Sequence, residues 1–496
     1  MVEQLSNLIE LLKYNPEEPL LFTSGLFLFL FLGFTLFYGF MRRTVTLRIV
    51  YVTLFSLYFY YKTSGIFFLL LMFTATSDFL IGRAIVRSAT RTSRRAWVTL
   101  SVCINLGMLG YFKYTNFLIE IVNSFLADPL EFKNIFLPIG ISFFTFQSMS
   151  YIIDLYRGRM QPLRRWIDYL FYISFFPQLV AGPIVRARDF IPQIHQRPVI
   201  VSRAQFGEGF WLIFCGLFKK AVISDFISLN FVDRIFDNPM LYTGLENLMG
   251  VLGYALQIYC DFSGYSDMAI GIALLLGFRF NANFDSPYKS ATITEFWRRW
   301  HISLSSWLKD YLYISLGGNR RGKLRTYLNL MLTMLLGGLW HGAAMRFIVW
   351  GGLHGAALAL HKWTMGRFPS SFRPLGMQMS RGRRVVGILL TFSFVCATWV
   401  FFRAPSMEIA GQVFSQIFTA FHPEIFFDFV AGYRWVVLLM AVGYVLHFAS
   451  ARVEAGTMRF VQRMPIVLYA VMMTALIWLI MQMRNGDVQP FIYFQF

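Results

Sequence analysis

Apolar runs of about 20 residues recur from one end of the chain to the other, and they constrain its fold most strongly. A helix of about 20 residues crosses the roughly 30 Å hydrocarbon layer of a bilayer, because each residue adds about 1.5 Å. Hydrophobic residues make up 56% of the chain, which is not typical of a soluble protein. We therefore expect an all-α polytopic membrane protein with about twelve spans. The predicted spans are 19–41, 46–61, 65–82, 97–113, 135–156, 208–226, 247–273, 324–341, 345–362, 384–402, 433–450 and 464–483.

The formal net charge of +19 is carried by the loops between these runs. Alternate loops are basic, as between Arg83 and Arg95 or between Arg298 and Arg325, whereas the loops between them are acidic or neutral. This alternation follows the positive-inside rule and predicts that both termini lie outside. The charge is therefore mainly a topological signal and does not indicate nucleic-acid binding. A smaller share could attract membrane lipid or an anionic ligand.

Residues 166–185 break the alternation, because Arg165 precedes this apolar run and Arg186 follows it. Pro177 and Pro183 would interrupt a helix there. Broken backbone at membrane depth is tolerated where it lines a cavity in the protein. We predict a re-entrant or interface-lying element, and the alternative is a spanning helix with unfavourable flanks.

The start of the chain and its four cysteines give no sign of a functional site. The first apolar run follows an acidic segment, so we expect a true span and no cleaved signal peptide. The cysteines lie in apolar runs without metal or disulfide spacing and are interpreted as small buried hydrophobic residues. They are Cys103, Cys215, Cys260 and Cys396.

His341 lies inside an apolar span, in the stretch LLGGLWHG. A titratable ring in an apolar span costs free energy and indicates a functional site. Neutral imidazole can take a proton from a hydroxyl and pass it to a leaving group. Gly337, Gly338 and Gly342 leave the backbone around His341 uncrowded, so that a helix or a ligand can approach closely. His341 is therefore the predicted reaction centre.

The loop 281–323 holds a second histidine, His301. At 100° per residue, His301 lies on the same side as the tryptophans and leucines of a predicted interface-lying helix, away from the charged residues. It should point toward the membrane or the protein body, and the alternative is a histidine that only bonds backbone. The apolar face is formed by Trp297, Trp300, Leu304, Trp307 and Leu308.

The basic turn from Gly317 to Gly322 closes this loop. Its arginines, Arg320 and Arg321, could contact a phosphate-bearing donor, but arginines here also satisfy the topology rule.

Polar groups enter two other spans. Gln147, Ser150, Tyr151 and Asp154 share one helical face, which predicts either a cavity lining or hydrogen bonds between helices. In QIYCDFSGYSDMAIG two carboxylates need partners, which could be arginines of the following loop, in a catalytic or a purely structural role. The candidate substrate-binding or donor-binding residues are Trp300, Arg298, Arg299, Arg320, Arg321, Trp340, Gln257, Asp261, Tyr265 and Asp267.

Two interpretations concern basic residues and further histidines. Lys219 and Lys220 interrupt an apolar run and are expected to extend toward an interface. His354 and His361 follow His341, but no carboxylate or cysteine has matching spacing, so we predict no metal site.

Several long stretches resemble motifs of the membrane-bound O-acyltransferase family. They cover about residues 20–496, and only the part before Pro19 departs from the pattern. The chain most resembles the branch that acetylates alginate and other bacterial exopolysaccharides, and the branch for teichoic-acid D-alanylation is related. The stretches are FWRRWHISLSSWLKDYLYISLGGNRRG, LLGGLWHGAAMRFIVWGGLHG, QIYCDFSGYSDMAIG, PQLVAGPIVR, FFTFQSMSYIIDLYRG and PFIYFQF.

The resemblance implies a ring of about 11–13 transmembrane helices, with re-entrant and interfacial helices, around a central histidine cavity. The essential buried histidine of the family falls on His341, and the second falls on His301. Expected parts are an outer-face extension (1–18), a catalytic core (19–383) that includes the inner loop 281–323, and C-terminal transmembrane helices (384–496).

The resemblance also implies the chemistry. Acetyl-CoA in the cytoplasm would be the donor substrate, with no bound cofactor, and the protein would lie in the bacterial inner membrane. The acceptor would be a cell-surface polysaccharide or a periplasmic partner acetyltransferase with a catalytic serine. Alternatives are D-alanyl transfer by the same fold and a non-catalytic transporter or flippase. A transporter would tend to show internal repeats, and we find none in the sequence.

Overall fold

The computed structural model describes residues 6, 10–41, 43–196, 199–367, 380–483 and 491–492. The regular elements of these residues are helices, as expected. Three parts of the predicted chain lie partly outside them, namely the N-terminal extension (1–5 and 7–9), the loop between the ninth and tenth predicted spans (368–379) and the PFIYFQF stretch (490 and 493–496).

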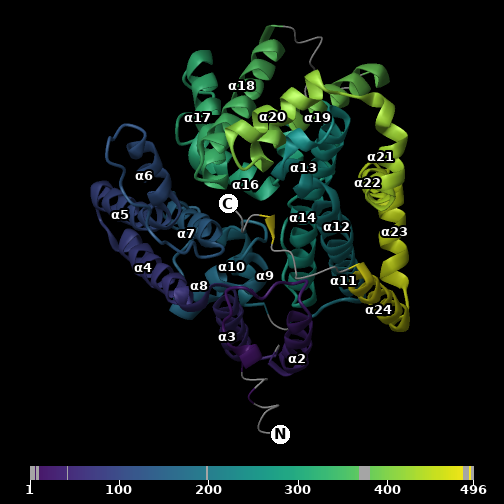
Figure 1. The fold of residues 1–496 in the computed structure, drawn as a ribbon. Coiled ribbons are helices and arrows are strands. Elements are labelled where there is room, and N and C mark those ends of the chain that lie inside the picture. The colour runs from purple at the N-terminus through teal and green to yellow at the C-terminus, as the bar shows by residue number, and fades with distance from the viewer. Residues whose placement is uncertain are drawn as a thin grey trace. The chain divides into compact units, whose positions relative to one another are not determined.

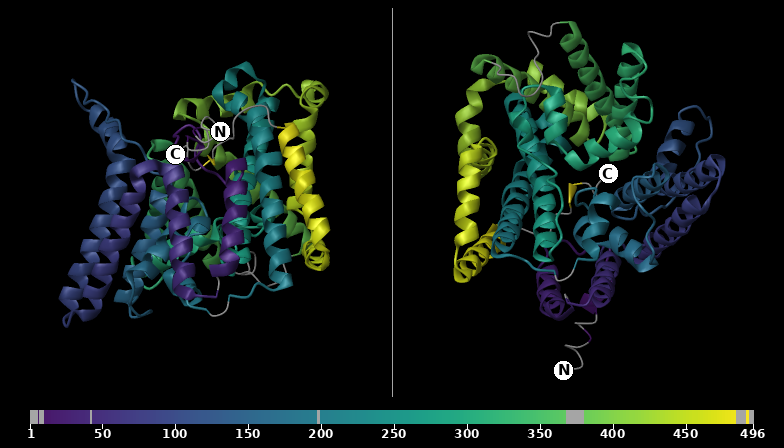
Figure 2. Two further views of the ribbon diagram at one scale, coloured as in Figure 1. Left: turned by 90° about the horizontal axis from the view of Figure 1, so that it is seen from below. Right: turned by 180° about the vertical axis from the view of Figure 1, so that it is seen from behind.

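The chain forms two compact units, of which the first comprises Met1–Gly209, Met268–Asn281 and Gly486–Pro490. Within it, α4, α5 and α7 lie side by side (Figures 1 and 2). Its helices are α2 (Gly25–Met41), α3 (Val45–Ser64), α4 (Phe68–Arg87), α5 (Arg91–Leu109), α6 (Thr115–Asn123), α7 (Ile141–Tyr156), α8 (Trp166–Ser174), α9 (Phe176–Leu179) and α10 (Ala187–Ile194). Of its cysteines, Cys103 is exposed, so its predicted burial is wrong.

A buried carboxylate joins the helices of the first unit. Asp78 of α4 accepts hydrogen bonds from Ser101 Oγ (2.5 Å) and Asn105 Nδ2 (2.8 Å) of α5 and from Ser148 Oγ of α7. Ser148 in turn lies 2.9 Å from the hydroxyl of Tyr169 on α8. Ser148 lies outside the polar face predicted on α7, whose Ser150 hydroxyl donates to the carbonyl oxygen of Gln147 in the same helix, so the role of that face stays a prediction.

The predicted re-entrant element, 166–185, forms two short helices. The nine residues of α8 end at Ser174, and α9 follows after Phe175, whose ψ of 108° is not helical. A nine-residue helix is about 14 Å long and cannot cross a bilayer alone. The spanning alternative is therefore wrong, and the broken, buried backbone agrees with the re-entrant prediction.

The second unit comprises Phe210–Asp267, Ala282–Asn485 and Phe491–Phe496. Two helices, α11 (Arg203–Leu217) and α14 (Gly244–Leu275), belong partly to each unit. The other α-helices of the second unit are α12 (Asp225–Ile227), α13 (Asp233–Asp237), α15 (Ile293–Arg299), α16 (Ile302–Trp307), α17 (Lys323–His341), α18 (Met345–Arg367), α19 (Arg381–Arg403), α20 (Met407–Thr419), α21 (Phe426–Gly432), α22 (Arg434–His447), α23 (Ala451–Arg463) and α24 (Ile466–Met483).

Every predicted span overlaps a helix, from α2 to α24, although residues 19–24 and 135–140 of two predicted spans are not helical. By length and composition, three described segments are long and apolar enough to cross a membrane: Val45–Arg87, Arg381–Arg403 and Ile466–Met483. A fourth would arise if Pro423–Gly432 and Arg434–His447, which are bent by 96°, form one span. The chain is thus a helical membrane protein, and about twelve crossings stay a prediction.

The helices α17 and α18 lie side by side and pack closely (Figure 1). A Cβ added to Gly351 would lie 2.4 Å from the carbonyl oxygen of Met334, so α18 approaches the backbone of α17 directly. The glycines in GGLWHG and GGLHG thus allow this pair of helices to approach, as predicted.

We predict that Gly351→Ala destabilises the protein and that Gly352→Ala does not. The new methyl group at Gly351 would press on a rigid backbone carbonyl, at a cost of about 1–3 kcal/mol. At Gly352 the nearest atom is Leu335 Cδ2 at 3.6 Å, an ordinary contact. The apparent melting temperature of the purified variants in detergent measures the difference. Equal melting temperatures would show that the two helices can separate freely.

Candidate functional site

The backbone of the second unit breaks its helix at Trp300 and His301. The helix α15 ends at Arg299, His301 has a positive φ of 43°, and α16 begins at Ile302. The predicted continuous interface-lying helix is therefore wrong. Trp300 and Trp307 are buried in the protein and do not anchor a surface helix. A left-handed conformation costs a non-glycine residue about 1–2 kcal/mol, so other contacts must hold it.

Asn283 supplies these contacts. Its backbone oxygen accepts a hydrogen bond from the Ile302 amide (2.9 Å). Its side-chain Oδ1 accepts from the amide (3.2 Å) and the hydroxyl (2.8 Å) of Ser303. Its Nδ2 donates to Ser266 Oγ on α14 at 3.1 Å. One asparagine thus satisfies donors at the start of α16 and ties this turn to α14.

The same Asn283 oxygen lies 3.2 Å from Nδ1 of His301. Because this oxygen already accepts from a backbone N–H, it must also be the acceptor toward the imidazole. Nδ1 of His301 therefore carries the proton, and Nε2 carries the lone pair. Burial lowers the pKa of His301 to about 3, so its ring is neutral at physiological pH. The histidine points into the protein, as predicted, and its partners include side chains and not only backbone.

His341 is the last residue of α17, and only 3% of its surface is exposed. Three aromatic rings stand nearly perpendicular to its imidazole, with centroids 5.0–5.3 Å away. The imidazole centroids of His341 and His301 are 6.5 Å apart. The structure thus brings together the two histidines that the sequence singled out. The surrounding rings belong to Trp340, Trp350 and Phe402.

Gly342 lets the chain turn directly after His341. Its backbone is extended, and an added Cβ would lie 1.9 Å from the ring of Phe347. The adjoining Arg346 donates to the carbonyl oxygens of Phe402 (3.0 Å) and Ala404 (2.6 Å) at the end of α19. The end of α17, the start of α18 and the end of α19 therefore fix the surroundings of His341.

Aromatic residues also close the other side of the histidine pair. The ring of Phe262 on α14 lies 4.6 Å from that of His301, and the ring of Phe491 lies 5.4 Å from Phe262. The ring centroid of Phe284 lies 5.1 Å from that of Trp300 and 6.4 Å from that of His301. With exposures of 3% and 0%, the two histidines form a closed centre. The family resemblance also implies passages from both membrane faces to the central histidine, and these stay a prediction.

The two carboxylates of α14 pair with lysines, so the expected arginine partners are wrong. Asp267 binds Lys219 (2.5 Å), and Asp261 binds Lys220 (2.6 Å). Lys220 also binds Asp225 at 2.7 Å and is 3% exposed, so its predicted extension toward an interface is wrong as well. Two nearby carboxylates stabilise a charged lysine better than an apolar boundary would.

Other candidate residues of α14 have local partners. Asp261 Oδ2 accepts from the amide of Ile492, and the ring of Tyr265 lies 5.0 Å from that of Phe491. Gln257 donates to Ser228 Oγ at 2.8 Å. The described residues of the C-terminal PFIYFQF stretch are thus packed against α14, beside the histidine centre.

The basic candidates are exposed or paired with carboxylates. Arg298 is exposed, whereas Arg299 binds Glu295 (3.1 Å) and Asp285 (2.9 Å). Arg320 and Arg321 are exposed just before α17, and His341 ends that helix about 27 Å away. At that distance the turn can attract an anion but does not contact the reacting atoms.

The remaining predicted histidines have structural partners. His354 accepts from Trp297 Nε1 (3.2 Å) and lies 3.0 Å from Thr398 Oγ1, and His361 lies 2.8 Å from Thr294 Oγ1. Within the described part of the chain, no group of three or more histidine, cysteine or acidic residues could hold a metal ion.

Sequence reasoning missed Asn283 and the aromatic rings from distant helices. Asn283 had no local indication, because the donors that it satisfies at the start of α16 lie about 20 residues later in the chain. Phe262, Trp350 and Phe402 had none, because aromatic residues in apolar helices are common and only the tertiary packing selects these three.

Comparisons with known proteins agree on one group. The model of the membrane-bound O-acyltransferase family matches residues 142–401. A probable alginate O-acetylase AlgI of Azotobacter vinelandii is 43% identical over 81% of this chain and 78% of its own. A peptidoglycan O-acetyltransferase of Helicobacter pylori is 36% identical over 79% of each chain. A teichoic acid D-alanyltransferase of Bacillus subtilis is 28% identical over 52% of this chain and 66% of its own.

We predict that Lys220→Met destabilises the protein far more than Lys219→Met. The first change leaves two carboxylates without their buried partner, at a cost of about 3–5 kcal/mol. The pair of Lys219 and Asp267 is more exposed, with 23% and 21% of the side chains accessible, so water compensates part of its loss. Thermal unfolding in detergent compares the two variants. A larger loss for Lys219→Met would contradict the assigned network.

Proposed function

The chain belongs to the membrane-bound O-acyltransferase family, and from this we propose that it takes acetyl from cytoplasmic acetyl-CoA and passes it outward to a cell-surface polysaccharide. Family membership makes the protein an O-acyltransferase, so the alternative of a non-catalytic transporter is wrong. The single observation that carries the proposal is the buried pair of His301 and His341. We place the protein in the bacterial inner membrane as a multi-pass protein.

His341 is the proposed general base. Its imidazole removes the proton of an acceptor hydroxyl while the oxygen attacks the thioester carbonyl. The carbon–sulfur bond then breaks, and the proton passes from the imidazolium to the thiolate of CoA. The last carbonyl groups of α17 carry partial negative charge and stabilise the imidazolium that forms between these steps.

His301 is the proposed second member of the centre. Because Asn283 holds the proton on Nδ1, Nε2 carries the lone pair, and in this proposal it accepts a hydrogen bond from the hydroxyl of the substrate that receives the acetyl group. The aromatic surroundings exclude water, which protects the thioester from hydrolysis. Since both rings are buried, substrate entry requires the centre to open.

A second route uses the same residues. In it, His341 attacks the thioester, carries the acetyl group and then gives it to the acceptor. Only this route lets labelled CoA exchange into acetyl-CoA when the acceptor is absent. The acceptor in either route is the polysaccharide or a periplasmic serine acetyltransferase that hands the group on.

Acetyl is a better supported cargo than D-alanine. The two O-acetylating relatives share 43% and 36% identity over about four fifths of this chain. The D-alanyltransferase shares 28% over 52%. The relatives act on different polymers by name, so we propose the substrate class, a glycan of the cell envelope.

The proposed function is tested by purified protein in liposomes with labelled acetyl-CoA on one side. We predict that His341→Ala lowers acetyl release or transfer at least about 100-fold, because a positioned base contributes that much. His361→Ala is the matched control, since this histidine contacts Thr294 and not the centre. His341→Gln tests the role without leaving a large cavity. Transfer that survives both His341 substitutions would refute the assignment.

We predict that Asn283→Ala lowers turnover about 10-fold or more, because His301 loses the acceptor that fixes its tautomer. His301→Ala should lower it at least as much. Asn283→Asp keeps an acceptor but adds a negative charge, which raises the pKa of His301 above its value of about 3. When the medium is acidified, this variant should therefore lose turnover at a higher pH than the wild type does. Unchanged pH profiles would show that Asn283 only supports the fold.

A further inference from the structure

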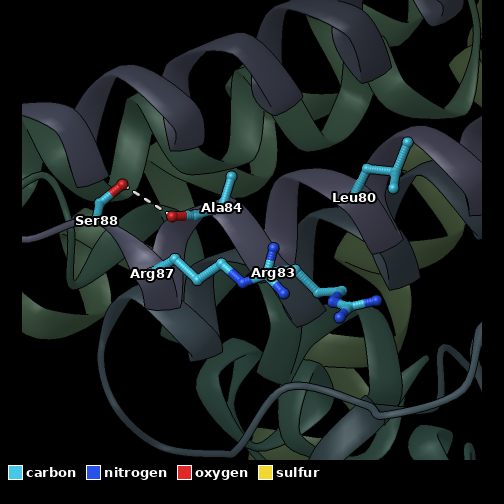
Figure 3. A pocket seen from close by; sticks show the side chains of 5 residues that line it. All are labelled: Leu80, Arg83, Ala84, Arg87 and Ser88. Carbon is cyan, nitrogen blue, oxygen red and sulfur yellow. Dashed lines mark hydrogen bonds between the residues drawn. The ribbon is translucent and has the colours of Figure 1, made fainter.

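A cavity of about 400 Å³ lies at the C-terminal end of α4 in the first unit. Figure 3 shows the side chains of Arg83 and Arg87 along the same side of this helix. Ser88 donates to the carbonyl oxygen of Ala84 at 2.8 Å and so occupies one acceptor of the helix end. The lining residues are Leu80, Arg83, Ala84, Arg87 and Ser88.

The two arginines lie one helical turn apart, and both are exposed. Neither forms an ion pair within the described residues. Two buried carboxylates of this unit bind other groups, since Asp78 accepts from Ser101 and Asp168 pairs with Arg165. Like charges at this spacing repel each other, and an anion between them would remove the repulsion. The ring of Phe79, 5.6 Å from the guanidinium carbon of Arg83, holds one of them in place.

An apolar stripe leads along α4 to these arginines. Leu69, Phe73 and Leu80 share the face of Arg83 and Arg87, because they are separated by multiples of three and four residues. Each of the three is at least half exposed. From Leu69 to Leu80 the stripe is about 17 Å long, close to half of the 30 Å hydrocarbon layer. It therefore matches the length of acyl chains in one leaflet.

The corner that follows adds positive charge and is locally fixed. Thr90 caps α5 by accepting from the Ser93 amide, and Ser93 Oγ donates to Ser88 Oγ at 3.0 Å. Arg95 of α5 donates to the hydroxyl of Tyr156 at the end of α7 (3.3 Å). The cavity thus lies on an ordered, basic corner of α4, α5 and α7. By the positive-inside rule this corner faces the cytoplasm.

We propose that this cavity binds an anionic phospholipid of the inner leaflet. Arg83 and Arg87 hold its phosphate, and the acyl chains lie along Leu69, Phe73 and Leu80. The phosphate of such a lipid pairs with the two arginines, and its acyl chains cover the exposed apolar stripe. A free phosphate would provide only the first.

The test uses the full chain, purified in a nonionic detergent and titrated with phosphatidylglycerol or phosphatidylcholine, with bound lipid counted by native mass spectrometry. Arg83→Gln with Arg87→Gln should weaken phosphatidylglycerol binding about 10- to 30-fold, from the usual contribution of two arginines near an anionic surface. Phosphatidylcholine binding should not change. A double variant, Arg83→Lys with Arg87→Lys, keeps the charge and should retain most of the affinity.

Arg381→Gln with Arg383→Gln is the matched control. It removes the same charge from exposed positions at the start of α19 and should leave binding within about twofold of the wild type. Equal phosphatidylglycerol affinity in the wild type and the Arg83/Arg87 glutamine variant would overturn the proposal. Displacement of the lipid by millimolar inorganic phosphate would overturn it too, because the site would then bind phosphate alone.

Discussion

The side-chain carbonyl of Asn283 is the contact on which the histidine centre depends. It accepts from the amide and hydroxyl of Ser303 and from the imidazole of His301. These bonds stabilise His301 in a left-handed backbone conformation between two short helices. That conformation costs free energy for any residue other than glycine. The same atom fixes which nitrogen of His301 carries the proton. Oδ1 of Asn283 therefore sets both the backbone conformation at His301 and the tautomer of its imidazole.

His341 reaches the same place by a different route. Glycines allow α17 and α18 to touch backbone to backbone, and Gly342 permits the tight turn that leaves His341 at the end of its helix. Burial among Trp340, Trp350 and Phe402 keeps water away from the ring. The charged groups of α14 are paired with lysines. The centre can therefore stay uncharged, which favours proton transfer to and from neutral groups.

Sequence patterns predicted the helices well, because apolar runs of this length have few alternatives. The break at 166–185 was also predictable, since prolines and basic flanks act locally. The patterns failed at Trp300 and His301, where a tertiary contact from Asn283 overrides a helical periodicity. They failed again at Lys219 and Lys220, whose carboxylate partners lie on another helix. The helical periodicity predicted only that His301 points toward the membrane or the protein body, and its separation of 6.5 Å from His341 follows from the tertiary packing.

The central claim is that the acyl group passes from CoA to its acceptor at the buried pair of His301 and His341. A structure of the protein with a non-hydrolysable thioether analogue of acetyl-CoA would test it most directly. The account predicts the carbon that corresponds to the thioester carbonyl about 3–4 Å from a ring nitrogen of His341. An analogue bound with that carbon outside the aromatic surroundings of His341 would contradict the account.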